Sequence, residues 1–174
     1  MSYCDFARGH PFHGPYHDEE YGFPITDDNR LFERLVLEIN QAGLSWLTIL
    51  KKREAFRKAY LDFDIDRVAR MKPERLLRDA GIIRNRLKIN AAIENARRIK
   101  ALPDSFAGWL DAHHPCSKDE WVKLFRKTFV FTGGEITGSF LLSTGYLPGA
   151  HDESCPVIAE IAKLGPPWMR VTNA

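Results

Sequence analysis

Apolar side chains recur at helical spacing in residues 31–46, which read LFERLVLEINQAGLSW. Leu31, Leu35, Glu38 and Ala42 are three or four positions apart, so a helix places all four on one stripe. An ionised carboxylate on such a stripe is costly unless it is paired. The spacing therefore predicts a largely buried helix on which Glu38 is either hydrogen-bonded within the protein or held for a cationic guest.

The rest of the chain shows helical periods and little strand-like alternation, so we expect an all-α fold. Residues 1–28 are rich in Gly, Pro, His and aromatic residues and predict an extended segment with one short helix near 17–21. Gly, Pro and capping residues bound the other expected helices. These span 29–42, 45–60, 65–71, 74–80, 84–101, 109–114, a segment starting at 118, 136–144 and 156–163.

The composition is that of an ordinary globular protein of one domain, or of two small lobes sharing one core, with 44% hydrophobic and 28% charged residues. No run approaches the ~20 apolar residues that span a bilayer, and the first residues lack the apolar core of a signal peptide. We expect a cytoplasmic protein without a membrane partner. Its three cysteines do not suggest a disulfide framework.

A basic hairpin is predicted within residues 76–100, where a short helix stops at Gly81 and a second helix begins a few residues later. The backbone N–H groups at the start of that second helix suit a phosphate oxygen. Nearby cations that could join them are Arg84, Arg86 and Lys88. The pattern resembles the helix-hairpin-helix of DNA repair proteins, although Ile83 stands where a second glycine is usual. An ordinary packing corner between two helices is the alternative.

A metal site is suggested by His151 and Cys155, which are one helical turn apart, together with Cys4 and His17 near the other end of the chain. A Cys2His2 set satisfies tetrahedral zinc and leaves no position open for water, so its role would be structural. From the spacing alone, an HxxxC pair is more often a coincidence than a metal site.

Four aromatic residues are candidates for a base-binding pocket. Phe6, Tyr16 and Tyr21 lie within residues 1–28, and Trp46 follows the helix expected over 29–42. Flat rings can sandwich a flipped nucleobase, and their faces attract a cation. Each ring taken singly could instead fill the core.

Taken together, four motifs resemble the DNA-3-methyladenine glycosylase I family. They are YHDEEYG (16–22), LEINQAGLSWLTILKKRE (37–54), DAGIIRNRLKI (79–89) and HxxxC (151–155). The likeness runs in order from Cys4 to Cys155. It implies a single glycosylase domain over residues 1–174, with two helical lobes of the helix-hairpin-helix glycosylase fold and the hairpin at about 73–101.

The resemblance also implies the site residues. Structural zinc would be held by Cys4, His17, His151 and Cys155, tethering the two terminal regions. The base pocket would be lined by Glu38, Tyr16 and Trp46, with Phe6 and Tyr21 where the family tends to place tryptophans. The segment 131–140 matches the far pocket wall, to which we assign Ser139. Gly138 replaces a bulky aromatic there, so either a cavity opens or Glu135 adds a second acid.

The implied activity is hydrolytic release of 3-methyladenine from alkylated double-stranded DNA by a monomeric, monofunctional glycosylase. Methylation gives the base a positive charge, and Glu38 would accept a hydrogen bond from its amino edge and stabilise that charge. Leu44 could wedge into the stack vacated by the base, or be a core leucine. Asp104 could assist the sugar cation, or be a solvated loop acid. The alternatives are a glycosylase for another alkylated base and a non-catalytic protein that binds damaged DNA.

Overall fold

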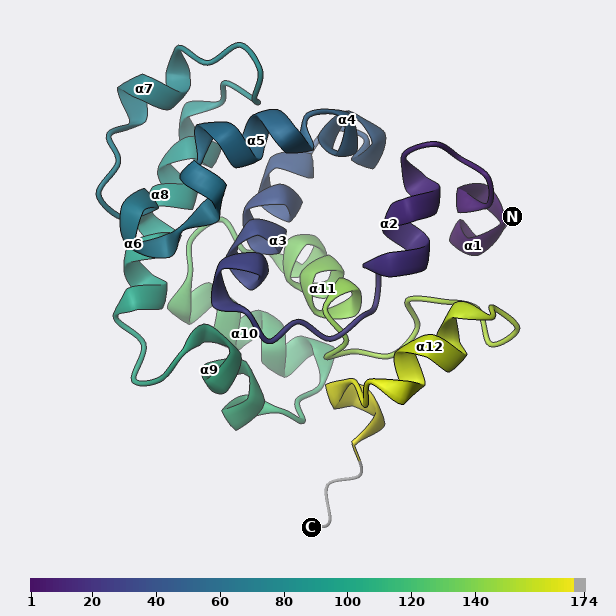
Figure 1. Cartoon of the computed structure of the whole chain (residues 1–174). Helices are drawn as coiled ribbons and strands as arrows, with labels where there is room; N and C mark the ends of the chain where they lie inside the picture. Colours follow the sequence, from purple (N-terminus) through teal and green to yellow (C-terminus); the bar gives the residue numbers. More distant parts are fainter. Residues whose placement is uncertain (171–174) are drawn as a thin grey trace.

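The computed structural model describes residues 1–170, and this part of the chain is helical without any strand. Figure 1 shows the helices wrapped around α3 and α11. The elements are α1 (Tyr3–Ala7), α2 (His13–Glu19), α3 (Asp28–Gln41), α4 (Trp46–Lys51), α5 (Arg53–Ala59), η1 (Leu61–Phe63), α6 (Ile65–Val68), α7 (Pro73–Leu77), α8 (Arg86–Lys100), α9 (Phe106–His113), α10 (Lys118–Thr128), α11 (Gly134–Ser143), α12 (Val157–Lys163) and η2 (Pro167–Met169). The expected all-α class is confirmed.

Helix α3 is the centre of the core. Every residue from Leu31 to Asn40 is buried, because α4, α8, α9 and α11 all pack against it. The side chain of Asp27 caps its first turn by accepting the backbone N–H of Arg30 at 2.9 Å. Gly43, at a φ of +78°, turns the chain into α4. The central helix therefore carries Glu38 into the protein interior, as its spacing predicts.

The predicted hairpin is present as α7 and α8, which pack side by side (Figure 1), but its turn is longer than expected. Helix α7 ends at Leu77 rather than near 80, and the carboxylate of Asp79 accepts the N–H of Gly81 at 2.8 Å within the turn. Helix α8 starts two residues later than predicted because Asn85 caps it, accepting the N–H of Lys88 at 3.1 Å. The turn thus spans residues 78–85.

Two further expectations need correction. The segment 1–28 contains two short helices, and the first begins at a capping box formed by Ser2 and Asp5. The single helix expected over 45–60 is divided into α4 and α5, because the backbone at Lys52 departs from helical angles (φ −94°, ψ 0°). No Gly or Pro lies at this position, so the break could not be predicted from the sequence. Within residues 1–170, no helix combines the length and the apolarity that crossing a bilayer requires.

Candidate functional site

A cavity of about 190 Å³ opens where α1, α2, α3, α4 and α11 meet. Three tyrosines, one tryptophan and one carboxylate dominate its wall. The residues that line it are Tyr3, Tyr16, Tyr21, Glu38, Gln41, Trp46 and Ser139. Five of these seven are predicted from the sequence, because Tyr16, Tyr21, Glu38, Trp46 and Ser139 all belong to the expected pocket.

Glu38 lies in the wall of this cavity with only 6% of its surface exposed. In the part of the chain that the structure describes, neither a hydrogen bond nor an ion pair engages its carboxylate. Burial raises the pKa of Glu38 from 4.5 to about 7, while the guanidinium of Arg34 works in the opposite direction. Of the two roles left open by the sequence, the geometry favours a carboxylate held for a cationic guest.

Aromatic rings form the rest of the wall. The ring of Tyr16 lies 5.2 Å from that of Trp46 and 5.7 Å from that of Tyr21, measured between centroids. Tyr3 meets the ring of Tyr21 edge-on at 5.1 Å. Such rings offer flat apolar surface to a planar guest, and their faces attract positive charge. The cavity therefore combines one buried acid with a surround suited to an aromatic cation.

The prediction for Phe6 is wrong. Its side chain is 49% exposed and packs edge-on against His13 at 5.0 Å, outside the cavity lining. Tyr3, one turn earlier on α1, lines the cavity instead. Helix α1 is not predicted from the sequence, so the side of it that faces the cavity could not be predicted either. Gln41 was also missed, although its position three residues after Glu38 on one helix could have indicated it.

The expectations for the far wall are also corrected. A side chain at Gly138 would meet Lys118, whose Cε lies 2.9 Å from the position of a Cβ, so this space is filled and does not enlarge the cavity. Glu135 is exposed in the first turn of α11 and is not part of the lining. Asp104 accepts the backbone N–H of Ser105 at 2.7 Å and likewise lies outside the lining, so it is a loop acid.

The residues predicted to contact DNA divide into two groups. Arg84 and Arg86 are exposed around the start of α8, and Leu44 is 39% exposed in the turn between α3 and α4. Gly81 lies in the hairpin turn, half-buried against Ala55.

Lys88 contradicts the prediction, because it is only 6% exposed and donates to the carbonyl oxygens of Asn40 at 2.7 Å and Ala42 at 2.6 Å. Its amine is therefore committed inside the protein and does not face a phosphate.

The four predicted metal-binding residues meet in one cluster. Atoms of Cys4, His17, His151 and Cys155 that can bind a metal all lie within 4.8 Å of one another. His17 Nε2 and His151 Nδ1 are 3.0 Å apart, and the sulfur-to-nitrogen distances are 3.6–3.8 Å. A tetrahedral zinc ion with bonds of about 2.3 Å to sulfur and 2.0 Å to nitrogen holds such atoms roughly 3.3–3.8 Å apart. The sulfur-to-nitrogen distances match that range and the two nitrogens lie slightly closer together, so the donor set fits a zinc ion.

Hydrogen bonds on the outer side of the cluster orient both imidazoles, so that one nitrogen of each ring faces the cluster. His151 donates from Nε2 to the carbonyl oxygen of Tyr21 at 2.6 Å, and His17 donates from Nδ1 to the carboxylate of Asp18 at 2.7 Å. The remaining nitrogen of each ring then carries a lone pair, and these two lone pairs face each other. A cation between them satisfies both, and this pattern of outer partners is typical of metal-bound histidines.

Comparison with known proteins places these features in a family. Residues 6–115 match the methyladenine glycosylase family. The chain is 33% identical to DNA-3-methyladenine glycosylase of Haemophilus influenzae over 88% of its length and 96% of that protein. It is 51% identical to DNA-3-methyladenine glycosylase 1 of Escherichia coli over 100 residues, which are 56% of this chain and 54% of that protein.

Solved structures agree. The fold matches 3-methyladenine DNA glycosylase I of Staphylococcus aureus, in a structure described as the basis of 3-methyladenine recognition, with a TM-score of 0.80 and 31% identity. That match covers 90% of this chain and 96% of the other. A structure of a point variant of 3-methyladenine DNA glycosylase I in complex with 3-methyladenine matches with a TM-score of 0.82 and 30% identity over 90% of this chain and 97% of that one. The chain therefore belongs to the methyladenine glycosylase family.

Proposed function

We propose that this protein is a monofunctional base-excision repair glycosylase that flips 3-methyladenine out of alkylated double-stranded DNA and releases it by hydrolysis. The observation that carries the proposal is the buried, unpaired carboxylate of Glu38 in the wall of a cavity built from aromatic rings. The family membership, and relatives named for the same activity, agree with it. One chain holds every residue of the cavity, which is consistent with action as a monomer.

The chemistry follows from the charge of the damaged base. Adenine methylated at N3 is cationic in DNA and leaves as a neutral base, so bond cleavage needs less assistance than it does for an unmodified base. The enzyme must chiefly extrude the nucleotide and bind the cation. The carboxylate of Glu38 accepts a hydrogen bond from the base and stabilises its charge, while Tyr16 and Trp46 supply ring faces. Neutral adenine leaves this buried carboxylate without a partner, which gives selectivity.

Binding of the duplex would use the α7–α8 unit as a helix-hairpin-helix. The N–H groups that open α8 can hold a phosphate oxygen, and the exposed guanidiniums of Arg84 and Arg86 add positive charge beside it. Such contacts anchor the backbone and read no base sequence. Leu44, exposed in the turn after α3, is suited to fill the gap in the stack that the flipped base leaves.

We further propose that the cluster of Cys4, His17, His151 and Cys155 holds one structural zinc ion. Four protein ligands complete a tetrahedral shell, so the ion would have no position open for water and would supply cross-linking rather than catalysis. Cys4 and His17 lie on α1 and α2, while His151 and Cys155 precede α12. The ion would therefore tie the helices that carry Tyr3 and Tyr16 to the C-terminal part of the chain.

The test is release of free bases from methylated duplex DNA by the native protein and by Glu38→Gln. We expect the native protein to release 3-methyladenine and the Glu38→Gln variant to release at least tenfold less, with Glu135→Gln as the control for an exposed acid. The same assay detects release of 3-methylguanine and 7-methylguanine, and release of one of these in place of 3-methyladenine would identify a glycosylase for another base. Binding of abasic-site DNA without any base release by the native protein would overturn the proposal in favour of a non-catalytic binding protein.

A further inference from the structure

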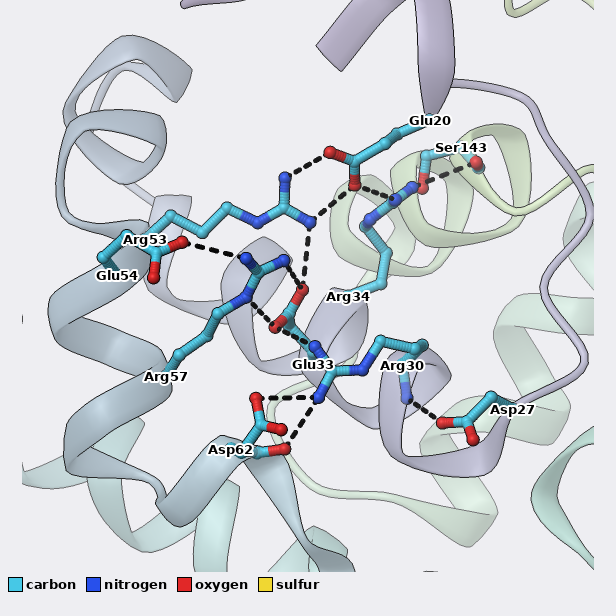
Figure 2. Close-up of polar contacts among 10 residues, drawn as sticks. All are labelled: Glu20, Asp27, Arg30, Glu33, Arg34, Arg53, Glu54, Arg57, Asp62 and Ser143. Atoms are coloured by element: carbon cyan, nitrogen blue, oxygen red, sulfur yellow. Dashed lines mark hydrogen bonds and ion pairs between the residues drawn. The ribbon is translucent and has the colours of Figure 1, made fainter. Parts of the chain in front are cut away.

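A network of partly buried ion pairs adjoins the cavity (Figure 2). Its two central carboxylates are Glu20, which follows α2, and Glu33 on α3. Arg53 donates to both of them, and Arg57 forms a two-pronged pair with Glu33 at 2.8 and 3.1 Å. The network ties α5 to α3 and to the chain that enters from α2, because each acid is shared by guanidiniums from different elements.

Arg34 links this network to the cavity. Its side chain is only 4% exposed and donates to the carbonyl oxygen of Ser143 at 3.0 Å and to the carboxylate of Glu20 at 3.4 Å (Figure 2). Its Cζ lies over the ring of Tyr16, 5.1 Å from the centroid. A guanidinium over an aromatic face is attracted to it and restrains its tilt. Arg34 thus supports a ring of the cavity wall without lining the cavity itself.

Arg34 is also placed one helical turn before Glu38, a spacing at which arginine and glutamate commonly form an ion pair. No such pair forms here, because the Ser143 carbonyl and the Glu20 carboxylate hold the guanidinium over the ring of Tyr16. The carboxylate of Glu38 therefore stays open to the cavity. The positive charge of Arg34 is still near enough to act against the effect of burial on Glu38.

The other groups that face Glu38 carry no charge near neutral pH. Tyr3 comes from α1, Tyr16 from α2 and Tyr21 from the chain after α2, and burial raises the pKa of each phenol above its usual value. The remaining lining residues are Gln41, Trp46 and Ser139, which do not titrate. Among the described residues around the cavity, Arg34 is thus the cation that acts on Glu38.

We propose that Arg34 is a positioning residue for the base pocket: tethered by Ser143 and Glu20, it braces the Tyr16 ring and holds a positive charge near Glu38 without pairing with it. Without a positive charge nearby, a carboxyl group in this largely apolar pocket would keep its proton and lose its attraction for a cationic base. An arginine free to pair with Glu38 would block the pocket. This inference rests on the proposed function, and it specifies how Glu38 stays unpaired and available to a cationic base.

The test is the titration of the Glu38 carboxyl carbon by ¹³C NMR in the full-length protein without DNA, with the signal assigned by its loss in Glu38→Gln. In Arg34→Gln the neutral amide can still donate to the Ser143 carbonyl, and we expect the midpoint to rise by roughly one pH unit, the effect of losing a nearby opposite charge. Arg34→Lys keeps the charge, so its midpoint should stay within a few tenths of a unit of the native value. Arg57→Gln is the matched control, since it loses a network guanidinium that does not reach the cavity.

Base release from methylated duplex DNA supplies the second readout. The acidic limb of its pH profile should move upward in Arg34→Gln by the same amount and stay in place in Arg57→Gln. An unshifted Glu38 midpoint in folded Arg34→Gln, or equal shifts in Arg34→Gln and Arg57→Gln, would overturn the role of Arg34. Should Arg34→Gln fail to fold, a midpoint displaced by a full unit in Arg34→Lys would overturn it as well. Absence of base release by the native protein would overturn the proposed function instead, while the NMR titration still judges Arg34.

Discussion

The side-chain amine of Lys88 lies 2.7 Å from the carbonyl oxygen of Asn40 and so joins α8 to the end of α3. It also donates to the carbonyl of Ala42 at 2.6 Å. The last carbonyls of a helix have no partner within it and form the negative end of its dipole, which a cation there satisfies. Through this one side chain, the hairpin is fastened to the helix that carries Glu38 and to the turn that carries Leu44.

Lys88→Met should therefore reduce stability rather than salt-sensitive DNA binding. The substitution leaves the buried carbonyl of Asn40 and the half-buried carbonyl of Ala42 without this donor, and we expect the free energy of unfolding to fall by about 1–3 kcal/mol. Urea unfolding measures this loss. Because Lys88 does not contact a phosphate, the slope of log K for DNA against log salt should match that of the native protein. A reduced slope at unchanged stability would show that the amine leaves its carbonyls for DNA.

Arg84→Ala and Arg86→Ala should give the opposite pattern. Both side chains are exposed beside the start of α8, so their loss should hardly change unfolding. If each neutralises one phosphate, each substitution should lower the steepness of the salt dependence by about 0.9 and weaken binding to all duplex sequences alike. Fluorescence anisotropy over a range of salt concentrations measures the slope, with Arg126→Ala on α10 as the control. Equal slopes in all three variants would contradict the proposal that the hairpin contacts DNA.

The contrast between these lysine and arginine residues marks a limit of prediction from sequence. Lys88 and its neighbours Arg84 and Arg86 are alike in charge and lie within one turn of the same helix start. Which of them is buried depends on where the end of α3 lies in space relative to α8, and no local sequence pattern encodes that arrangement. The bounds of α3 were predictable to within one residue at either end, because its apolar residues recur at the spacing of one buried helix face.

The pocket shows the same division. Glu38 could be singled out because a charge interrupts an apolar stripe, and Tyr16, Tyr21, Trp46 and Ser139 could be assigned through the family resemblance. Phe6 could not be separated from Tyr3, since α1 is too short to show a period and its direction is set by contacts with the rest of the fold. The meeting of the four Cys and His side chains likewise depends on residues up to 151 positions apart in the chain, which spacing alone cannot bring together.

Loss of one ligand should disrupt the proposed zinc site. The native protein, prepared without chelator, should contain about one zinc per chain by elemental analysis, and Cys155→Ser should contain far less. Because the ion would cross-link the two terminal regions, Cys155→Ser should also unfold at a lower temperature by several degrees. Cys116→Ser is the matched control, since Cys116 lies outside the cluster and donates to the carbonyl of His113. Equal zinc content in the two variants would contradict the assignment.

Glu38 should make the native protein less stable as the pH rises. Burial raises the pKa of Glu38 from 4.5 to about 7, so the carboxyl is protonated in both folded and unfolded chains below 4.5. Between these values the unfolded chain ionises first and the folded state loses stability, on the order of 3 kcal/mol once the pH exceeds the folded pKa. Glu38→Gln lacks this linkage. Its stability relative to the native protein should therefore rise steadily from about pH 5 to about pH 8 in urea unfolding measured at matched pH.

The exposed acid Glu135 provides the comparison for this last experiment, because Glu135→Gln removes a carboxylate that already lies in water on α11. Its stability difference from the native protein should be small and independent of pH over the same range. A Glu38→Gln difference that is equally flat would mean that the acid is solvated or paired. The pocket would then lack the unpaired charge that makes a cationic base its preferred guest, even with its ring wall intact.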